Sequence, residues 1–306
     1  MAKKENNFRC GVVSIVGRPN VGKSTLLNEI LGHKVAIVSP VPQTTRQQIR
    51  GIYHEERGQI IFIDTPGVHE GKDHLNKYMN SASMGTLDEV DCVIYLVDTS
   101  RKIGEEEHNV AGHLKSLKIP IIVGLNKIDL KGKYLAEYIE FWEKVVGKPV
   151  QEMTNCTLVA LSGEEGKNID KLVDVVFEYL PIGPALYPAD IKSDVPQRAV
   201  IADIIREKLF NCLRDELPHA VAVSVEQMQR RKKAIYIQAT IYVERDTQKI
   251  IVIGGNGQLL KDIGTLARTE LESLLGAKIF LELFVKTQKN WRDNLSTLQE
   301  LGYFNS

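Results

Sequence analysis

The 306-residue sequence has only 4 cysteines, only 2 tryptophans and no net formal charge. The cysteines lie tens of residues apart, without a Cys-x-x-Cys pair or a Cys/His pair at zinc-like spacing. The sequence therefore predicts neither a disulfide framework nor a zinc site, and a reducing cytosol fits best. A chain without net charge has no whole-molecule field for nucleic acid or an anionic membrane, so such a partner must be bound by a local site.

Long hydrophobic runs, internal repeats and low-complexity tracts are also missing. The longest apolar run, Cys92–Val97, is too short to cross a bilayer, and Val12–Val16 is too short for a signal peptide. Any membrane association is therefore expected to be peripheral. With 43% hydrophobic and 25% charged residues the chain has the composition of a folded protein, and its length predicts two domains.

Residues 8–180 alternate between apolar β-rich runs and segments of helical periodicity, which is typical of an α/β sheet covered on both faces. The predicted strands are 8–16, 59–63, 91–97, 120–125 and 154–160. The predicted helices are about 22–31, 76–87, 104–117, 133–147 and 167–179. Val110, Leu114 and Leu117 form an apolar stripe that is expected to pack in the core.

Residues 181–196 are predicted to link two domains, because they hold Pro181, Pro184, Pro188 and Pro196. Beyond this linker the pattern predicts a compact α+β domain. Its expected elements are a helix at about 196–213, strands at about 220–228 and 234–244, a helix at 258–275 and a strand at 278–286. The proposed division is therefore residues 1–180, the linker 181–196 and residues 197–306.

A phosphate-binding motif follows the first predicted strand. The pattern G-x-x-x-x-G-K-[ST] is matched by Gly17, Arg18, Pro19, Asn20, Val21, Gly22, Lys23 and Ser24. In this context backbone N–H groups and a helix N-terminus can bind phosphate, Lys23 can contact the outer phosphates and Ser24 can bind Mg²⁺. By itself the motif could also be a glycine turn with a chance Lys-Ser pair.

Three further motifs follow later strands. Asp64, Thr65, Pro66 and Gly67 end one strand and place a carboxylate near the magnesium shell, with the Gly67 N–H near a γ-phosphate. Asn126, Lys127, Ile128 and Asp129 end another, and the Asp can accept hydrogen bonds from the N1–H and 2-amino groups of guanine. Ser162 and Gly163 follow a third and could support the base. Because carboxyl ends of parallel strands meet at one edge, these motifs together predict a guanine-nucleotide site.

In these motifs the chain resembles the G domain of translation-factor-related GTPases. Asn20 and the Gln43-Thr44-Thr45-Arg46 segment resemble the Era branch of that group. The resemblance implies a mixed, mostly parallel sheet and a switch segment around residues 39–46. It implies that Thr44 or Thr45, with Thr45 favoured, joins Ser24 in binding Mg²⁺, with Asp64 in the second shell. The expected catalytic residues are Lys23, Thr45, Gly67 and Asn20.

The residue after Gly67 is Val68, where many GTPases carry a glutamine that orients the attacking water. Unaided hydrolysis of GTP is therefore expected to be slow. Resemblance to potassium-stimulated members of the superfamily suggests that Asn20 holds K⁺, although Asn in a tight loop could instead serve an unusual backbone conformation. His69 and His74 could position water, but solvated loop histidines are more common.

The second domain contains an I-G-x-x-G sequence, made of Ile253, Gly254, Gly255, Asn256 and Gly257, before a helix that includes Lys261. It resembles a KH RNA-binding domain, of type II if a short helix precedes Gly254. This implies that the loop approaches the sugar-phosphate backbone of single-stranded RNA. The alternative is a plain Asn-Gly turn.

Other residues of this domain leave two interpretations open. The basic run Arg230–Lys233 could contact phosphates or form a solvated hairpin tip. Trp291 could stack on a base or seal an edge of the core.

The resemblance to the Era family covers essentially the whole chain. It implies a monomeric, GTP-hydrolysing switch that binds the 3′ end of small-subunit 16S ribosomal RNA and assists 30S assembly in the cytoplasm, with a peripheral location on the inner face of the cell membrane left open. Two departures are Gly163 in place of the family's usual Ala and a less basic stretch at 284–288. The alternatives are a regulator of a protein or membrane partner, a P-loop kinase or ATPase, and a passive RNA-binding scaffold.

Overall fold

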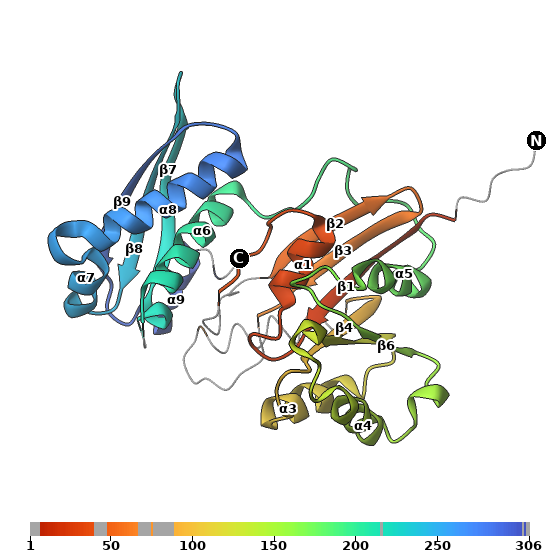
Figure 1. The fold of residues 1–306 in the computed structure, drawn as a ribbon. Coiled ribbons are helices and arrows are strands. Elements are labelled where there is room, and N and C mark those ends of the chain that lie inside the picture. The colour runs from red at the N-terminus through yellow and green to blue at the C-terminus, as the bar shows by residue number, and fades with distance from the viewer. Residues whose placement is uncertain are drawn as a thin grey trace, which may run out of the picture. The chain divides into compact units, whose positions relative to one another are not determined.

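The computed structural model describes residues 7–39, 48–66, 75, 89–214, 217–301 and 303. The chain forms two compact units. The first consists mainly of Tyr78–Asp194 with the preceding strands, and the second mainly of Val195–Ser306. Each unit has its own sheet, covered by helices (Figure 1).

The first unit is built on a six-stranded sheet in the order β2-β3-β1-β4-β5-β6. Only β2 runs antiparallel to its neighbour, and the other pairs are parallel. The strands are β1 (Arg9–Val16), β2 (Ile49–Glu55), β3 (Gly58–Asp64), β4 (Cys92–Asp98), β5 (Ile121–Asn126) and β6 (Cys156–Ala160). The predicted mixed, mostly parallel sheet is confirmed, with β2 as a strand that the sequence pattern did not predict.

The described helices of this unit are α1 (Lys23–Leu31), α3 (Glu105–Leu114), α4 (Leu135–Val146) and α5 (Ile169–Tyr179). Helices α3 and α4 pack over one face of the sheet, and α1 and α5 lie on the other (Figure 1). Val110 and Leu114 of α3 are buried in the core, and Leu117 packs against this core, as predicted. The predicted helix 76–87 lies outside the described residues.

The central strands β3 and β4 are buried over their whole length because both faces of the sheet are covered. All seven residues of β3 and of β4 are buried, including the polar side chains of Asp64 and Asp98 at their carboxyl ends. Burying a carboxylate is costly unless it is paired, so polar or charged partners are expected beside these two aspartates at the carboxyl ends of the strands.

The proline-rich segment 181–194 lies along the first unit. Ile182 bridges to Arg9, and Ser193 bridges to Gly51 of β2. The side chain of Gln59 accepts hydrogen bonds from the Leu186 and Tyr187 N–H groups at 2.8 and 2.9 Å. This segment is therefore attached to the sheet, and the first unit extends to Asp194.

The second unit has the element order α-β-β-α-α-β expected of its predicted fold. Its elements are α6 (Gln197–Cys212), β7 (Ala222–Arg230), β8 (Ile235–Val243), α7 (Asp246–Ile253), α8 (Gln258–Leu275) and β9 (Ile279–Thr287), followed by α9 (Leu295–Glu300). The sheet order is β7-β8-β9, with β7 antiparallel and β9 parallel to β8. The short helix α7 is the piece required before Gly254.

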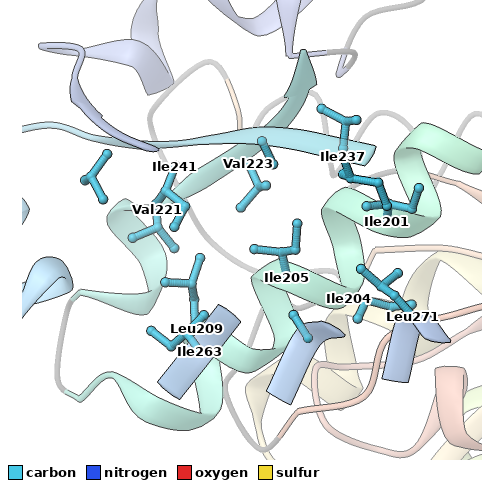
Figure 2. Close-up of a cluster of buried hydrophobic side chains, with 14 of the residues drawn as sticks. Ile201, Ile204, Ile205, Leu209, Val221, Val223, Ile237, Ile241, Ile263 and Leu271 are labelled. Atoms are coloured by element: carbon cyan, nitrogen blue, oxygen red, sulfur yellow. The ribbon is translucent and has the colours of Figure 1, made fainter. Parts of the chain in front are cut away.

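Helices α6 and α8 pack on one face of this sheet through branched aliphatic side chains (Figure 2). The contacts join Ile205 and Leu209 of α6 with Ile237 of β8 and Ile263 of α8, all fully buried. Trp291 is also fully buried, and its Nε1 donates to the Ala220 carbonyl at 3.0 Å, so this residue seals the core. In the part of the chain that the structure describes, no helix is long and apolar enough to cross a membrane.

Candidate functional site

The phosphate-loop motif lies between β1 and α1, as predicted. Its glycines are required by space and by backbone conformation. A Cβ at Gly17 would lie 2.4 Å from the Leu96 carbonyl oxygen, and Gly22 has φ 100° with a Cβ position 2.6 Å from Asn126 Nδ2. Asn20 adopts the left-handed conformation, φ 63°. The loop therefore turns tightly into the N-terminus of α1, where backbone N–H groups are available to an anion.

Lys23 opens α1 with its side chain inside the loop. Only 7% of the residue is exposed, and its Nζ donates to the Gly17 and Arg18 carbonyls, both at 3.0 Å. Burial lowers the pKa of Lys23 to about 8, although Asp64 and Glu107 act in the opposite direction. Because the nearby carboxylates do not offset the cost of burying this ammonium group, a bound phosphate would stabilise its charged form.

The ends of β1 and β3 lie side by side, with Ile15 paired to Asp64. This register brings Ser24 of α1 within reach of Asp64: the Ser24 Oγ donates to Asp64 Oδ2 at 2.6 Å. Thr65 Oγ1 donates to the Ile15 carbonyl at 2.9 Å and fixes the chain leaving β3. A hydroxyl and a carboxylate beside a phosphate loop are the hard oxygen donors that Mg²⁺ uses, together with phosphate oxygens.

Asn126 connects the phosphate loop with the Ser162-Gly163 turn. Its Nδ2 donates to the Val21 carbonyl at 2.8 Å, and its Oδ1 accepts the Gly163 N–H at 3.0 Å. Asp129 accepts a hydrogen bond from the Ser162 Oγ at 2.5 Å. Hydrogen bonds thus join the phosphate loop, the Asn126–Asp129 motif and the Ser162-Gly163 turn at one edge of the sheet.

Lys127 makes a second connection. It has a left-handed backbone, φ 64°, and its Nζ donates to the Asn20 carbonyl at 2.8 Å and to Asp98 Oδ2 at 2.9 Å. Burial alone would raise the pKa of Asp98, but hydrogen bonds from Lys127 and Ser100 outweigh it and hold this pKa below its usual value. Asp98 is therefore an ionised anchor for the lysine.

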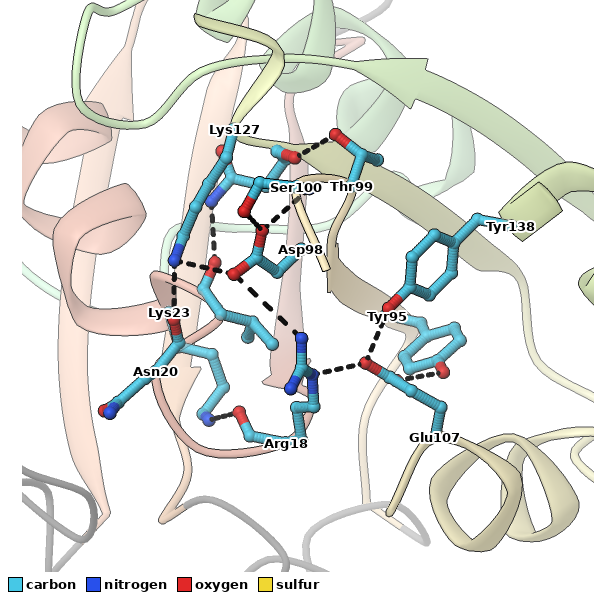
Figure 3. A network of polar contacts seen from close by, with 12 residues as sticks. Arg18, Asn20, Lys23, Tyr95, Asp98, Thr99, Ser100, Glu107, Lys127 and Tyr138 are labelled. Atoms are coloured by element: carbon cyan, nitrogen blue, oxygen red, sulfur yellow. Dashed lines mark hydrogen bonds and ion pairs between the residues drawn. The ribbon is translucent and has the colours of Figure 1, made fainter. Parts of the chain in front are cut away.

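A buried network behind the phosphate loop was not predicted from the sequence (Figure 3). Arg18 Nε lies 2.7 Å from Glu107 Oε1, and its Nη2 lies 4.0 Å from Asp98 Oδ2. Glu107, in the first turn of α3, is fully buried and accepts hydrogen bonds from the Tyr95 hydroxyl at 2.7 Å and the Tyr138 hydroxyl at 3.3 Å. Burial raises the pKa of Glu107, while Tyr95 and Arg18 partly offset that effect.

One signal could have revealed this network. Glu107 lies three and seven residues before Val110 and Leu114, on the buried stripe of α3, whereas Glu105 and Glu106 are exposed. A carboxylate on an apolar helix face requires a buried partner, and a cation in the phosphate loop is a natural candidate.

The I-G-x-x-G sequence of the second unit connects α7 to α8. Gly254 and Gly257 have φ values of 74° and 75°, and a Cβ at Gly254 would lie 2.7 Å from the Leu259 Cβ. Gly255, Asn256 and Lys261 are exposed. The loop thus presents backbone and a lysine to solvent next to the N-terminus of an 18-residue helix.

Several predicted site residues fall outside the described part of the chain. They are Thr44, Thr45, Gly67, Val68, His69 and His74. Among the described residues, no group of three or more His, Cys, Asp or Glu side chains is arranged to hold a metal ion by itself.

Comparison with known proteins identifies the family. Residues 12–127 match a family described as 50S ribosome-binding GTPase, and residues 216–292 match the KH domain. The GTPase Era of Geobacter metallireducens is 46% identical over 303 residues, which cover 98% of this chain and 99% of that protein. The chain belongs to the Era family of GTPases. The Era protein of Halothermothrix orenii is 41% identical over 97% of this chain and 99% of its own.

Solved Era structures share the whole fold. Era in complex with MgGDPNP and nucleotides 1506–1542 of 16S ribosomal RNA is 36% identical, with a TM-score of 0.92, and the match covers 97% of this chain and all of that one. A single-residue variant of Aquifex aeolicus Era bound to GDP·AlF4⁻ is 38% identical, with a TM-score of 0.90 over the same shares. The predicted family, its G domain followed by a KH domain, and GTP hydrolysis as its activity are confirmed.

Proposed function

We propose that this Era-family GTPase is a switch that binds the 3′ end of small-subunit 16S ribosomal RNA and assists assembly of the 30S subunit. The observation that carries the proposal is the full-length similarity to Era bound to MgGDPNP and nucleotides 1506–1542 of that RNA. Two local features also support the proposal. The motifs at the carboxyl ends of the strands in the first unit are joined by hydrogen bonds, and the G-x-x-G loop of the second unit is exposed.

In this proposal the first unit binds GTP with Mg²⁺. Lys23 contacts the outer phosphates, Ser24 supplies a hydroxyl to the metal, and Asp64 acts from the second shell. When bound, the metal neutralises charge on the phosphate oxygens. The carboxylate of Asp129 reads the guanine edge, held in place by the Ser162 hydroxyl, and the Gly163 turn supports the base. The roles of Thr45 or Thr44 and of Gly67 rest on the family resemblance.

We propose in addition that the Asn20 side chain holds K⁺. The left-handed backbone at Asn20 gives an independent reason for asparagine at this position, because Asn tolerates that conformation well. Replacing sodium by potassium is expected to raise the rate of GTP hydrolysis if the Asn20 side chain also holds the cation. Equal rates in the two salts would leave only the backbone role.

In the second unit, the proposal assigns RNA binding to Ile253, Gly254, Gly255, Asn256, Gly257 and Lys261. The positive φ values at both outer glycines keep the backbone free of Cβ atoms where it would meet a sugar-phosphate chain. RNA binding would then depend on the switch: we expect tighter binding in the GTP state than in the GDP state.

A cytoplasmic location for a monomer is part of the same proposal, and the location is supported by the cysteines. All four, Cys10, Cys92, Cys156 and Cys212, are free thiols, as expected in a reducing compartment. Contact with the inner face of the membrane rests on the family resemblance alone. The alternative, a regulator with a protein or membrane partner, rests on the nucleotide site alone.

The proposal is tested by measuring affinity for an RNA of nucleotides 1506–1542 with the non-hydrolysable analogue GDPNP and with GDP. The double substitution Gly255→Asp and Asn256→Asp places two carboxylates where phosphates are expected, and should weaken binding at least about tenfold. Ser273→Asp, an exposed position farther along α8, is the matched control and should bind as the unmodified protein does. Unchanged binding by the double variant would favour the protein-partner alternative. Equal affinity in the two nucleotide states would refute the coupling.

A further inference from the structure

The face of the second sheet that points away from α6 and α8, here called the outer sheet face, carries aromatic side chains. Along β8, Ile235, Ile237 and Ile241 belong to the core. Because side chains alternate along a strand, Tyr236 and Thr240 project from the outer sheet face. The parallel register pairs Tyr236 with Phe280 and Thr240 with Phe284 of β9, so both phenylalanines lie on this face as well.

Two of these rings are unusually accessible for phenylalanine. Phe280 is 55% exposed and Phe284 is 46% exposed. The rings of Tyr236 and Phe280 are nearly parallel, with centroids 5.9 Å apart and an interplanar angle of 21°. Phe284 follows Phe280 by four residues on the same strand, which places the two Cα atoms about 13 Å apart. Neighbouring exposed aromatic side chains on one sheet face form a candidate binding site.

A basic side chain lies near each end of this aromatic row. The Arg231 guanidinium lies 4.2 Å from the centroid of the Tyr236 ring. It belongs to the exposed basic run 230–233, which leads into β8 beside Phe280, and Lys286 is exposed two residues beyond Phe284. The carboxylates on this face, Glu282 and Glu226, accept hydrogen bonds from the Tyr236 and Tyr242 hydroxyls at 2.6 and 3.1 Å. Arg231 and Lys286 therefore equal the two carboxylates in number, and both carboxylates are engaged by tyrosine hydroxyls.

We infer that the outer sheet face is a second RNA-binding surface, on which unpaired bases stack on Phe280 and Phe284 while phosphates contact Arg231 and Lys286. Bases stack on aromatic rings and on arginine planes with little dependence on sequence, and basic side chains attract the backbone. A purely apolar partner would not need the guanidinium over the tyrosine or the basic turn. The inference deepens the proposed function and rests on it, but it concerns a face of the sheet and not the G-x-x-G loop.

The test measures binding of the full-length protein to two probes, the RNA of nucleotides 1506–1542 and an unstructured oligouridine. Phe280→Leu and Phe284→Leu keep apolar volume but remove the ring, and each is expected to weaken oligouridine binding about tenfold. Phe280→Trp and Phe284→Trp keep a stacking surface and should bind as tightly as the unmodified protein or more tightly. Leu266→Ala, at an exposed apolar position on α8, is the control and should have no effect.

The outcomes separate this inference from the proposed function. If both leucine variants bind both probes like the unmodified protein, while Gly255→Asp/Asn256→Asp has lost the ribosomal RNA, the outer sheet face is not an RNA site and the proposed function stands. If the unmodified protein binds neither RNA, both fall. Loss with leucine and retention with tryptophan, together with ultraviolet crosslinks at Phe280 or Phe284, would establish stacking.

Discussion

At the scale of single residues, Asp129 is the side chain that we propose reads the base. Its carboxylate is held by the Ser162 hydroxyl and can accept hydrogen bonds from two neighbouring donors on guanine. Asp129→Asn replaces one acceptor by a donor, which suits the 2-oxo group of xanthine. We expect GTP affinity to fall roughly 100-fold or more and XTP to become the preferred ligand, because a site built for a hydrogen bond strongly rejects a mismatched group.

This prediction is checked by competition between GTP, XTP and ATP for a fluorescent nucleotide. Asp170→Asn, an exposed aspartate in the first turn of α5, is the matched control and should leave the order of affinities unchanged. If Asp129→Asn still preferred GTP, Asp129 would not be the base-reading residue, and a P-loop protein indifferent to guanine would again be a reasonable interpretation.

Lys23 provides a pH-dependent prediction. Its pKa of about 8 in the protein lies below its ordinary value of 10.5, chiefly because of burial. Bound phosphates favour the charged form, so nucleotide binding should raise this pKa and take up a proton. Nucleotide affinity should therefore fall as pH rises above about 8, because Lys23 of the free protein loses its proton there. Well below that pH, Lys23 stays charged and does not change the affinity.

Calorimetry in two buffers of different ionisation enthalpy measures the proton directly. At about pH 8.5 we expect a net uptake of protons by Lys23, and almost none by it at about pH 6.5. Lys23→Arg keeps the charge at both pH values and should abolish the uptake at the higher one. An uptake that persisted in the arginine variant would assign the proton to another group.

At the scale of elements, α3 supports the phosphate loop through a single side chain. Glu107→Gln removes the charge that faces Arg18 and leaves the guanidinium, whose side chain is only 12% exposed, without its closest anion, because the glutamine oxygen can accept a hydrogen bond but carries no charge. Breaking a buried ion pair on one side typically costs about 3–5 kcal/mol, and partial exposure of Arg18 reduces this to about 2–3 kcal/mol. We expect the free energy of unfolding to fall by that amount and nucleotide affinity to fall with it, because Arg18 belongs to the loop.

Urea unfolding and nucleotide titration test both effects. Glu106→Gln, the neighbouring residue on the exposed side of α3, removes the same charge and should change neither quantity by more than about 0.5 kcal/mol. If Glu107→Gln lowered stability but left affinity intact, the network would stabilise α3 without positioning the loop.

The elements also show what the sequence could and could not reveal. Strands β1, β3, β4 and β5 were predictable because apolar residues dominate them, and polar motifs begin at the carboxyl ends of β1, β3 and β5. Strand β2 was missed because it is partly exposed, with Arg50 on its outer side, and lies at the edge of the sheet beside β3. The place of Glu107 on the buried stripe of α3 signals a buried partner, but the sequence alone does not single out Arg18, because the packing of α3 decides which cation Glu107 meets.

At the scale of the whole molecule, the absence of net charge makes a prediction about salt. RNA affinity should depend on salt through the few basic side chains that contact phosphate, since no overall field contributes. Each such contact adds about 0.7 to the slope of log affinity against log salt concentration for a single strand. Lys261→Gln, beside the G-x-x-G loop, should therefore weaken binding to the 1506–1542 RNA at low salt and reduce the slope by about that amount.

The matched control for this salt dependence lies in the first unit. Lys115→Gln, at an exposed position, removes the same charge from the molecule and should leave the slope unchanged. The slope depends on the number of basic side chains that contact RNA phosphates, and not on the net charge of the protein. If both substitutions lowered the slope equally, binding would follow the total charge of the molecule, and a local RNA site on the second unit would be contradicted.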